Sequence, residues 1–291
     1  MSQRYSARCE RLPGSRVRRG GRHLHALRKK KTAARQAKPF RVLNIDEIAQ
    51  EKGHGNFVLV LSAPEEGYVL DVLPDRERKT LEKWLDELPP EVKKAIKTVN
   101  LDMWEPYTLA VKAKLPQARI VVDRFHVMKN LNHCLTMARR EIQRMASDKV
   151  KQQLKGSRWA LVKNEKDLNE KQRAKLEAVY QVSPQLKVCH QLKEQFRTIF
   201  ETSTDREKAR TALQHWIEQV QKQNVTAFQS FLVTLNNWFD LILNYFLERW
   251  TNAFAEGVNN KIKLIKRRAF GFTNFDHFRL RILVECAPNP T

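Results

Sequence analysis

All the strand signals of this chain lie before Val122, and every strong signal from Phe125 to about Phe246 is helical. Short apolar runs predict five strands, namely Arg41–Asp46, Phe57–Ala63, Tyr68–Leu73, Ile96–Leu101 and Arg119–Val122. The tight turn at residues 64–67 joins the second and third strands into a hairpin. Helices are predicted at Arg76–Glu87, before Pro89-Pro90, and at Glu105–Ala113. This order predicts an α/β fold whose mixed sheet has three antiparallel strands followed by two parallel ones.

A long helical segment then interrupts the α/β pattern. Ser183 and Pro184 supply the cap and the first-turn proline of one helix, and Thr204-x-x-Glu207 has the pattern of a capping box. Apolar residues at helical spacing mark another helix, and these are Phe228, Phe231, Leu232, Leu235, Trp238, Phe239 and Ile242. The segment is therefore predicted to be an all-helical insertion or a second domain.

The last helix that the sequence predicts begins near Thr251 and has two different faces. One is a core stripe of Phe254, Val258, Ile262 and Ile265, and the other carries Asn252, Glu256, Asn259 and Lys263. Basic residues fill its second half, namely Lys261, Lys263, Lys266, Arg267 and Arg268. This basic cluster either contacts phosphates or forms a solvated face, and Gly271 fits a helix stop.

The net charge points to a polyanionic partner. The 291 residues include 54 Lys+Arg and 32 Asp+Glu, a net +22, which favours nucleic acid. Thirteen basic residues and one acid lie in residues 1–40, which predicts a disordered basic arm that contacts phosphates or is only a solvated tail. No apolar run approaches the roughly 18 residues of a membrane helix. The four cysteines lack the paired spacing of a zinc site and suit a reducing cytoplasm.

Three carboxylates are candidates for a metal site. Asp46 ends the first predicted strand and Asp102 follows the fourth, so both reach one sheet edge if those strands are adjacent. Glu256, on the polar face of the later helix, can pack against that edge. Hard cations prefer oxygen ligands, and two such ions support phosphoryl transfer. Acids at strand ends are also commonly loop residues or helix caps, and the competitors for this role are Glu47, Asp71, Glu105 and Asp123.

Four segments carry the motifs of a known family: NIDEIAQEKGHGNFVLVL, VNLDMWEPY, ARIVVDRFHVMKNLN and RWTNAFAEGVNNKIKLIKRRAFGFTNFDHFRLRI. In this order, between Phe40 and Leu283, they resemble the DDE transposases of bacterial insertion sequences, in the ISL3 group. The resemblance implies an RNase H-like catalytic core interrupted by a helical insertion. The predicted organisation is a basic arm at residues 1–40, core at 41–124, insertion at 125–246 and the rest of the core at 247–291.

The same resemblance implies a catalytic and metal-binding triad of Asp46, Asp102 and Glu256. It implies a transposase that cuts double-stranded DNA at element ends and joins the freed 3′ hydroxyl to a target, with two Mg²⁺ ions or Mn²⁺ as substitute. A homo-oligomer on DNA in the bacterial cytoplasm, at the nucleoid and without a membrane partner, is also implied. The motif Asp123-x-x-His126 resembles one that supports DNA binding or the active site in related transposases, although His126 can also simply cap or pack a helix.

Residues 1–40 depart from the family pattern. Members of the family carry a longer N-terminal region with a cysteine-rich zinc-binding module and a helix-turn-helix, whereas these residues hold only Cys9 and no amphipathic helix pair. The sequence is therefore interpreted as an N-terminally truncated copy, with a fragment of a disrupted reading frame and a core with its own reduced arm as alternatives. Two rival functions stay open, namely a catalytically inactive DNA-binding relative and an RNase H-like nuclease without strand transfer.

Overall fold

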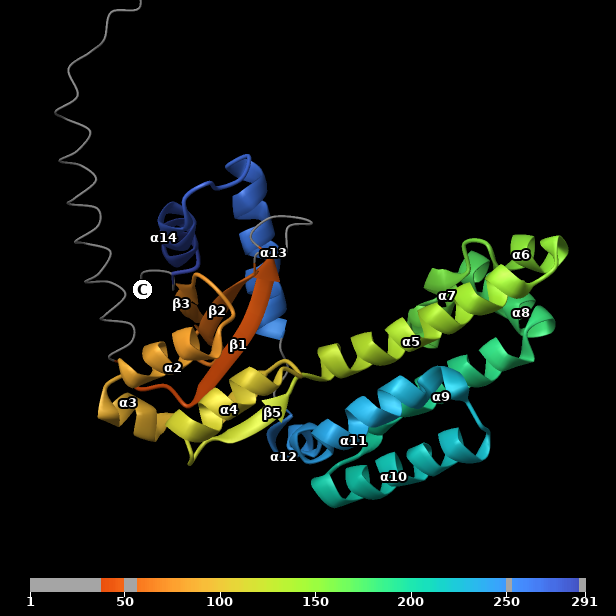
Figure 1. Ribbon diagram of the computed structural model, residues 1–291, viewed down its shortest axis with the longest axis horizontal. Coiled ribbons are helices and arrows are strands. Elements are labelled where there is room, and N and C mark those ends of the chain that lie inside the picture. Colours follow the sequence, from red (N-terminus) through yellow and green to blue (C-terminus); the bar gives the residue numbers. More distant parts are fainter. Residues whose placement is uncertain (1–37, 50–56, 250–252, 288–291) are drawn as a thin grey trace, which may run out of the picture.

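A computed structural model describes residues 38–49, 57–249 and 253–287 (Figure 1). Five strands form one sheet in the order β3-β2-β1-β4-β5. They are β1 (Val42–Ala49), β2 (Phe57–Ala63), β3 (Tyr68–Leu73), β4 (Thr98–Leu101) and β5 (Arg119–Val122). β2 is antiparallel to both β1 and β3, whereas β1, β4 and β5 run parallel to one another. The predicted α/β class and strand directions are confirmed, and the arrangement is consistent with an RNase H-like fold.

Helices cover both faces of the sheet. On one face lie α2 (Arg78–Asp86), α3 (Pro90–Ala95) and α4 (Glu105–Lys114), which share a core with Leu43 and Ile45 of β1. On the other face α13 (Ala253–Arg268) and α14 (Phe275–Glu285) share a core with Ile48 of β1. Successive strand residues point to opposite faces, so β1 contributes to both cores and its even-numbered residues face α13.

The insertion between β5 and α13 is entirely helical. Its elements are α5 (Arg124–Met145), α6 (Asp148–Leu154), α7 (Arg158–Val162), η1 (Glu165–Asp167), α8 (Glu170–Val182), α9 (Pro184–Thr202), α10 (Arg206–Lys222), η2 (Thr226–Phe228), α11 (Gln229–Leu243) and α12 (Tyr245–Glu248). In Figure 1 α5 leads away from the sheet, and α11 runs back toward it. There the Asn244 side chain donates to the carbonyl of Ile120 at 2.8 Å, and Val122 of β5 belongs to the hydrophobic core of the insertion.

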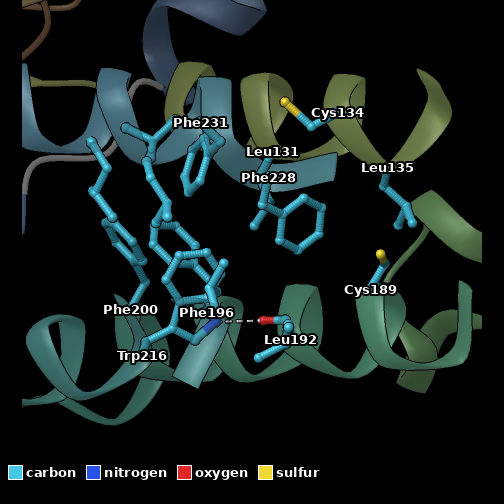
Figure 2. Close-up of a cluster of buried hydrophobic side chains, with 14 of the residues drawn as sticks. Leu131, Cys134, Leu135, Cys189, Leu192, Phe196, Phe200, Trp216, Phe228 and Phe231 are labelled. Carbon is cyan, nitrogen blue, oxygen red and sulfur yellow. Dashed lines mark hydrogen bonds between the residues drawn. The ribbon is translucent and has the colours of Figure 1, made fainter. Parts of the chain in front are cut away.

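Aromatic side chains hold the insertion together, and Figure 2 shows them between α5, α9 and α11. The ring centroid of Phe196 lies 4.8 Å from that of Trp216 and 5.2 Å from that of Phe231, both in edge contacts that aromatic pairs favour. The indole N–H of Trp216 donates to the carbonyl of Leu192 at 2.8 Å. These contacts join α9, α10 and α11 through one buried aromatic centre.

Several local predictions are corrected by the structure. Asp46 does not end its strand, because β1 continues to Ala49 in pairing with β2. The cap of α10 is Asp205, whose carboxylate accepts from the backbone N–H of Lys208 at 2.8 Å, so the capping box at Thr204 is wrong. A carboxylate one position later caps as well as a hydroxyl does.

Two predictions concern the end of the chain. Gly271 stops α13 as predicted, with a φ of +100° and its N–H bonded to the carbonyl of Lys266 at 3.1 Å. However, α13 is not the last helix, because α14 follows it and buries Phe278 and Ile282. The arm up to residue 37, including Cys9, and the positions Thr251 and Asn252 lie outside the described residues. Within those residues no helix has the length and apolar character needed to cross a membrane.

Candidate active site

The carboxyl ends of the three parallel strands meet at one edge of the sheet, and each brings an aspartate there. Asp46 lies two residues beyond Asn44, which pairs with Asn100 in the β1–β4 register. Asp102 directly follows β4, and Asp123 directly follows β5. Because strand side chains alternate with a period of two, this register places Asp46 and Asp102 side by side on the face that α13 covers.

Asp46, Asp102 and His126 form a compact cluster in which one ligand atom from each lies within 4.8 Å of the others. Nδ1 of His126 lies 2.5 Å from Oδ1 of Asp102 and 3.3 Å from Oδ2 of Asp123. The contact with Asp102 lacks hydrogen-bond alignment, and both of its atoms are buried without an aligned partner among the residues of the structure. Buried oxygen and nitrogen atoms without aligned hydrogen-bond partners are suited to be ligands of a divalent cation.

Asp123 fixes the start of α5. Its buried carboxylate caps the helix by accepting from the backbone N–H of Phe125 at 3.0 Å, and its other oxygen faces His126. The cap and the ion pair together set the orientation of the first turn of α5. Asp123 therefore caps α5 and His126 faces Asp102, while a role of this motif in DNA binding or catalysis stays a prediction.

Helix α13 closes the site from the opposite side. The side-chain amide of Asn259 donates to Oδ2 of Asp46 at 2.7 Å. The predicted core stripe is confirmed for Val258, Ile262 and Ile265, which are buried against the sheet. Glu256 lies one turn before Asn259 and is exposed. Because the apolar stripe packs against the sheet, Asn259 of the polar face of α13 lies next to Asp46.

A cavity of about 640 Å³ lies between β1, the start of α5 and α13. Its wall includes Asp46, Asp123, His126 and Glu256 of the predicted site, and further lining residues are Arg124, Phe125, Lys129, Tyr245, Asn259, Asn260 and Lys263. Glu256 thus shares the cavity with Asp46, but its carboxylate is not part of the Asp46–Asp102–His126 cluster.

The five predicted basic residues of α13 are placed differently from one another. Lys263 lines the cavity, whereas Lys261 and Arg267 are exposed outside it. Lys266 donates to the carbonyl of Ala49 at 2.5 Å, so it ties α13 to the end of β1. Arg268 pairs with Glu285 of α14.

The site holds more negative charge than its environment supports. Burial and, to a smaller extent, the nearby charge of Asp102 raise the pKa of Asp46 to about 6, although His126 and Asn259 act in the opposite direction. Burial also lowers the pKa of His126, but its contacts with Asp102 and Asp123 outweigh this and raise the pKa to about 10. Without another cation, a proton on His126 offsets part of the carboxylate charge.

The competing acids have other roles in the structure. Glu47 is among the residues that line the cavity, but its carboxylate accepts a hydrogen bond from the hydroxyl of buried Tyr107. Asp71 accepts two hydrogen bonds from Arg279, at 2.6 and 2.8 Å. Glu105 is exposed at the start of α4 and does not line the cavity.

Sequence reasoning did not assign site roles to Asn259, Arg124 or Phe125. A signal existed for Asn259, because it lies three residues after Glu256 on the polar face of the predicted helix. Phe125 lies inside the Asp123-x-x-His126 motif, but nothing in its spacing indicated that it faces a cavity.

The raised pKa of Asp46 predicts that Asp46→Asn stabilises the metal-free protein. The folded carboxyl keeps its proton up to about pH 6, against an ordinary value of 3.8, so this contribution to stability is lost as pH rises through 6. The neutral variant avoids that loss, and its unfolding free energy at pH 7 should be up to about 3 kcal/mol higher. Urea denaturation in EDTA measures this difference.

The advantage of the variant should disappear as pH falls from 6 toward 4, because the Asp46 carboxyl of the unfolded native chain then takes up a proton as the folded one has done. Added Mg²⁺ should stabilise the native chain and not Asp46→Asn, since a bound cation stabilises only the protein that binds it. A variant less stable than the native chain at pH 7 in EDTA would contradict the electrostatic account.

Comparison with known proteins gives a consistent result. A family model described as a transposase, for DDE transposases of the ISL3 type, matches residues 43–282. The transposase for insertion sequence element IS1001 of Bordetella parapertussis is 32% identical over 249 residues, which cover 82% of this chain and 59% of that protein. The transposase for IS1557 of Mycobacterium tuberculosis is 28% identical over 259 residues, covering 80% and 57%.

A further match, to an ATP-dependent protease of Lactococcus lactis, covers only 57 residues, or 20% of this chain. The two transposase matches extend over most of this chain, but the chain spans less than two thirds of the length of each of those proteins.

Proposed function

Because this chain belongs to the ISL3 family of transposases, we propose that it cleaves DNA at insertion-sequence ends and transfers the freed 3′ end to target DNA. The observation that carries this proposal is the cluster of Asp46, Asp102 and His126. Asp46 and His126 of this cluster line a cavity that Glu256 also lines. Carboxylates grouped in this way are suited to divalent cations and so to phosphoryl transfer.

The proposed metal ligands are Asp46 and Asp102, with Glu256 completing the set from α13. When bound, two Mg²⁺ ions, or Mn²⁺ in their place, supply charge stabilisation for the attacking and leaving oxygens of a phosphodiester. Asn259 orients the Asp46 carboxylate through its hydrogen bond at 2.7 Å. His126 holds Asp102 in place. While no cation is bound, His126 can also carry a proton that offsets part of the carboxylate charge.

The basic residues around the cavity support contact with a DNA backbone. Lys263 faces it from α13, and Arg124 and Lys129 face it from α5. Three cations placed near the carboxylates can hold the phosphates on either side of a reacting one. We further propose that the protein acts as a homo-oligomer on double-stranded DNA, in the bacterial cytoplasm at the nucleoid.

The experiment that tests this function uses the full chain and linear DNA that includes the sequences flanking its gene. In Mg²⁺, denaturing gels should show strand cuts at defined positions, and a pre-cut 3′ end should become joined to a second duplex. EDTA should abolish both products. DNA binding without any cuts would instead support an inactive DNA-binding relative, and cuts without joined products would support a nuclease.

A further inference from the structure

One large apolar side chain in the first turn of α5 is exposed beside the candidate metal ligands. Phe125 has 59% of its surface exposed and lines the cavity. Further along α5, the apolar residues Val127 and Leu131 are buried in the core of the insertion. Exposing an aromatic ring to water forfeits the free energy of its burial, and a ligand with an apolar face bound in the cavity would recover it.

The orientation of the Phe125 ring is set by its neighbours. The carboxylate of Asp123 accepts from the Phe125 backbone N–H, and His126 is held next to Asp102. The ring packs edge-on against the imidazole of His126, with centroids 5.4 Å apart and planes at 82°. The imidazole of His126 thus contacts both the phenyl ring and the Asp102 carboxylate, and the ring lines the same cavity as Asp46.

The surroundings of Phe125 are suited to a nucleotide. Lys129 lies one turn further along the same face of α5, and Lys263 lines the cavity from α13. A ring flanked by cations from two helices can bind a base by stacking and the adjoining phosphates by charge. A cavity of about 640 Å³ has the size of pockets that hold one small ligand, so it admits one or two nucleotides and not a duplex.

We propose that Phe125 is the platform on which the unpaired base next to the reacting phosphate stacks. The inference rests on the proposed function, because that function places a phosphate at Asp46 and Asp102. It adds a recognition step, in which the strand leaves the duplex at the cavity and its base is held against the phenyl ring.

Binding of short single strands tests this proposal without any cleavage. The probes are an eight-nucleotide oligothymidylate and the same strand with abasic sites in place of all bases, both in EDTA and moderate salt. Phe125→Ala should weaken binding of the oligothymidylate by about five- to 150-fold, the range for loss of one stacked base, and should leave the abasic strand unaffected. Phe125→Trp should retain binding, because the larger ring still stacks.

The comparison between strands cancels phosphate contacts made elsewhere, because those contacts do not depend on the bases. Trp159→Ala is the matched control, since Trp159 is 61% exposed on α7 and does not line the cavity. It should bind both strands as the native chain does. Equal weakening of both strands by Phe125→Ala would show that Phe125 only positions His126, and no weakening of either would also overturn the proposal.

The outcome is separable from that of the proposed function. If Phe125→Ala weakens binding of the oligothymidylate alone but the native chain makes no Mg²⁺-dependent cuts, the stacking proposal is supported and the proposed catalysis is contradicted. If cuts occur while Phe125→Ala binds both strands normally, catalysis stands and the platform fails.

Discussion

Asp46→Asn is expected to lower the rate of Mg²⁺-dependent DNA cleavage by roughly a thousandfold or more, while DNA binding stays nearly unchanged. The substitution keeps the side-chain volume and an oxygen that can accept from Asn259, but it removes a charged metal ligand. Loss of metal-assisted charge stabilisation is worth several kcal/mol in the transition state, which converts to this change in rate. Cleavage rates on the flanking DNA, measured with saturating protein, give the comparison.

Asp102→Asn and Glu256→Gln should have effects of the same order. For Glu256 the result is especially informative, because its exposed carboxylate lies in the cavity wall but outside the Asp46–Asp102–His126 cluster. Glu105→Gln is the matched control, since this acid is also exposed but does not line the cavity. Native cleavage rates in Glu256→Gln would remove Glu256 from the triad, and native rates in Asp46→Asn would contradict the proposed site.

Trp216→Ala is expected to reduce the free energy of unfolding by about 3–5 kcal/mol, which is the usual cost of removing a buried tryptophan. Trp216 is 2% exposed, contacts the rings of Phe196 and Phe231, and donates to the carbonyl of Leu192. With the ring of Phe228 counted as well, the variant loses apolar burial, three aromatic contacts and one hydrogen bond at the centre of the insertion. Urea denaturation followed by circular dichroism measures the loss.

Trp159→Ala serves as the control for this prediction, because exposed positions usually change stability by no more than about 0.5 kcal/mol. Trp159 is 61% exposed, so its removal leaves no buried cavity. Equal stability losses in the two variants would show that the aromatic centre is not what holds the helices of the insertion together.

Local patterns predicted the elements of the core well. The limits of β2, β3 and β5 agree with the predicted strands, because short apolar runs between turns and charges depend on few residues. The errors arose where a neighbouring strand or helix decides the outcome. β1 extends past Asp46 because β2 continues to pair with it, and no local feature of the β1 sequence shows where that partner ends.

The sequence by itself determined the type of fold, the helical insertion, the apolar stripe of α13 and the chain positions of the acids. All of these depend on local periodicity or composition. Only the tertiary structure decided which side chains meet: Asp102 with His126, Asp46 with Asn259, and Phe125 with the open cavity. The physical reason is that strand register and helix packing set these contacts. They join residues that are distant in the chain, so the local sequence pattern around each residue does not predict them.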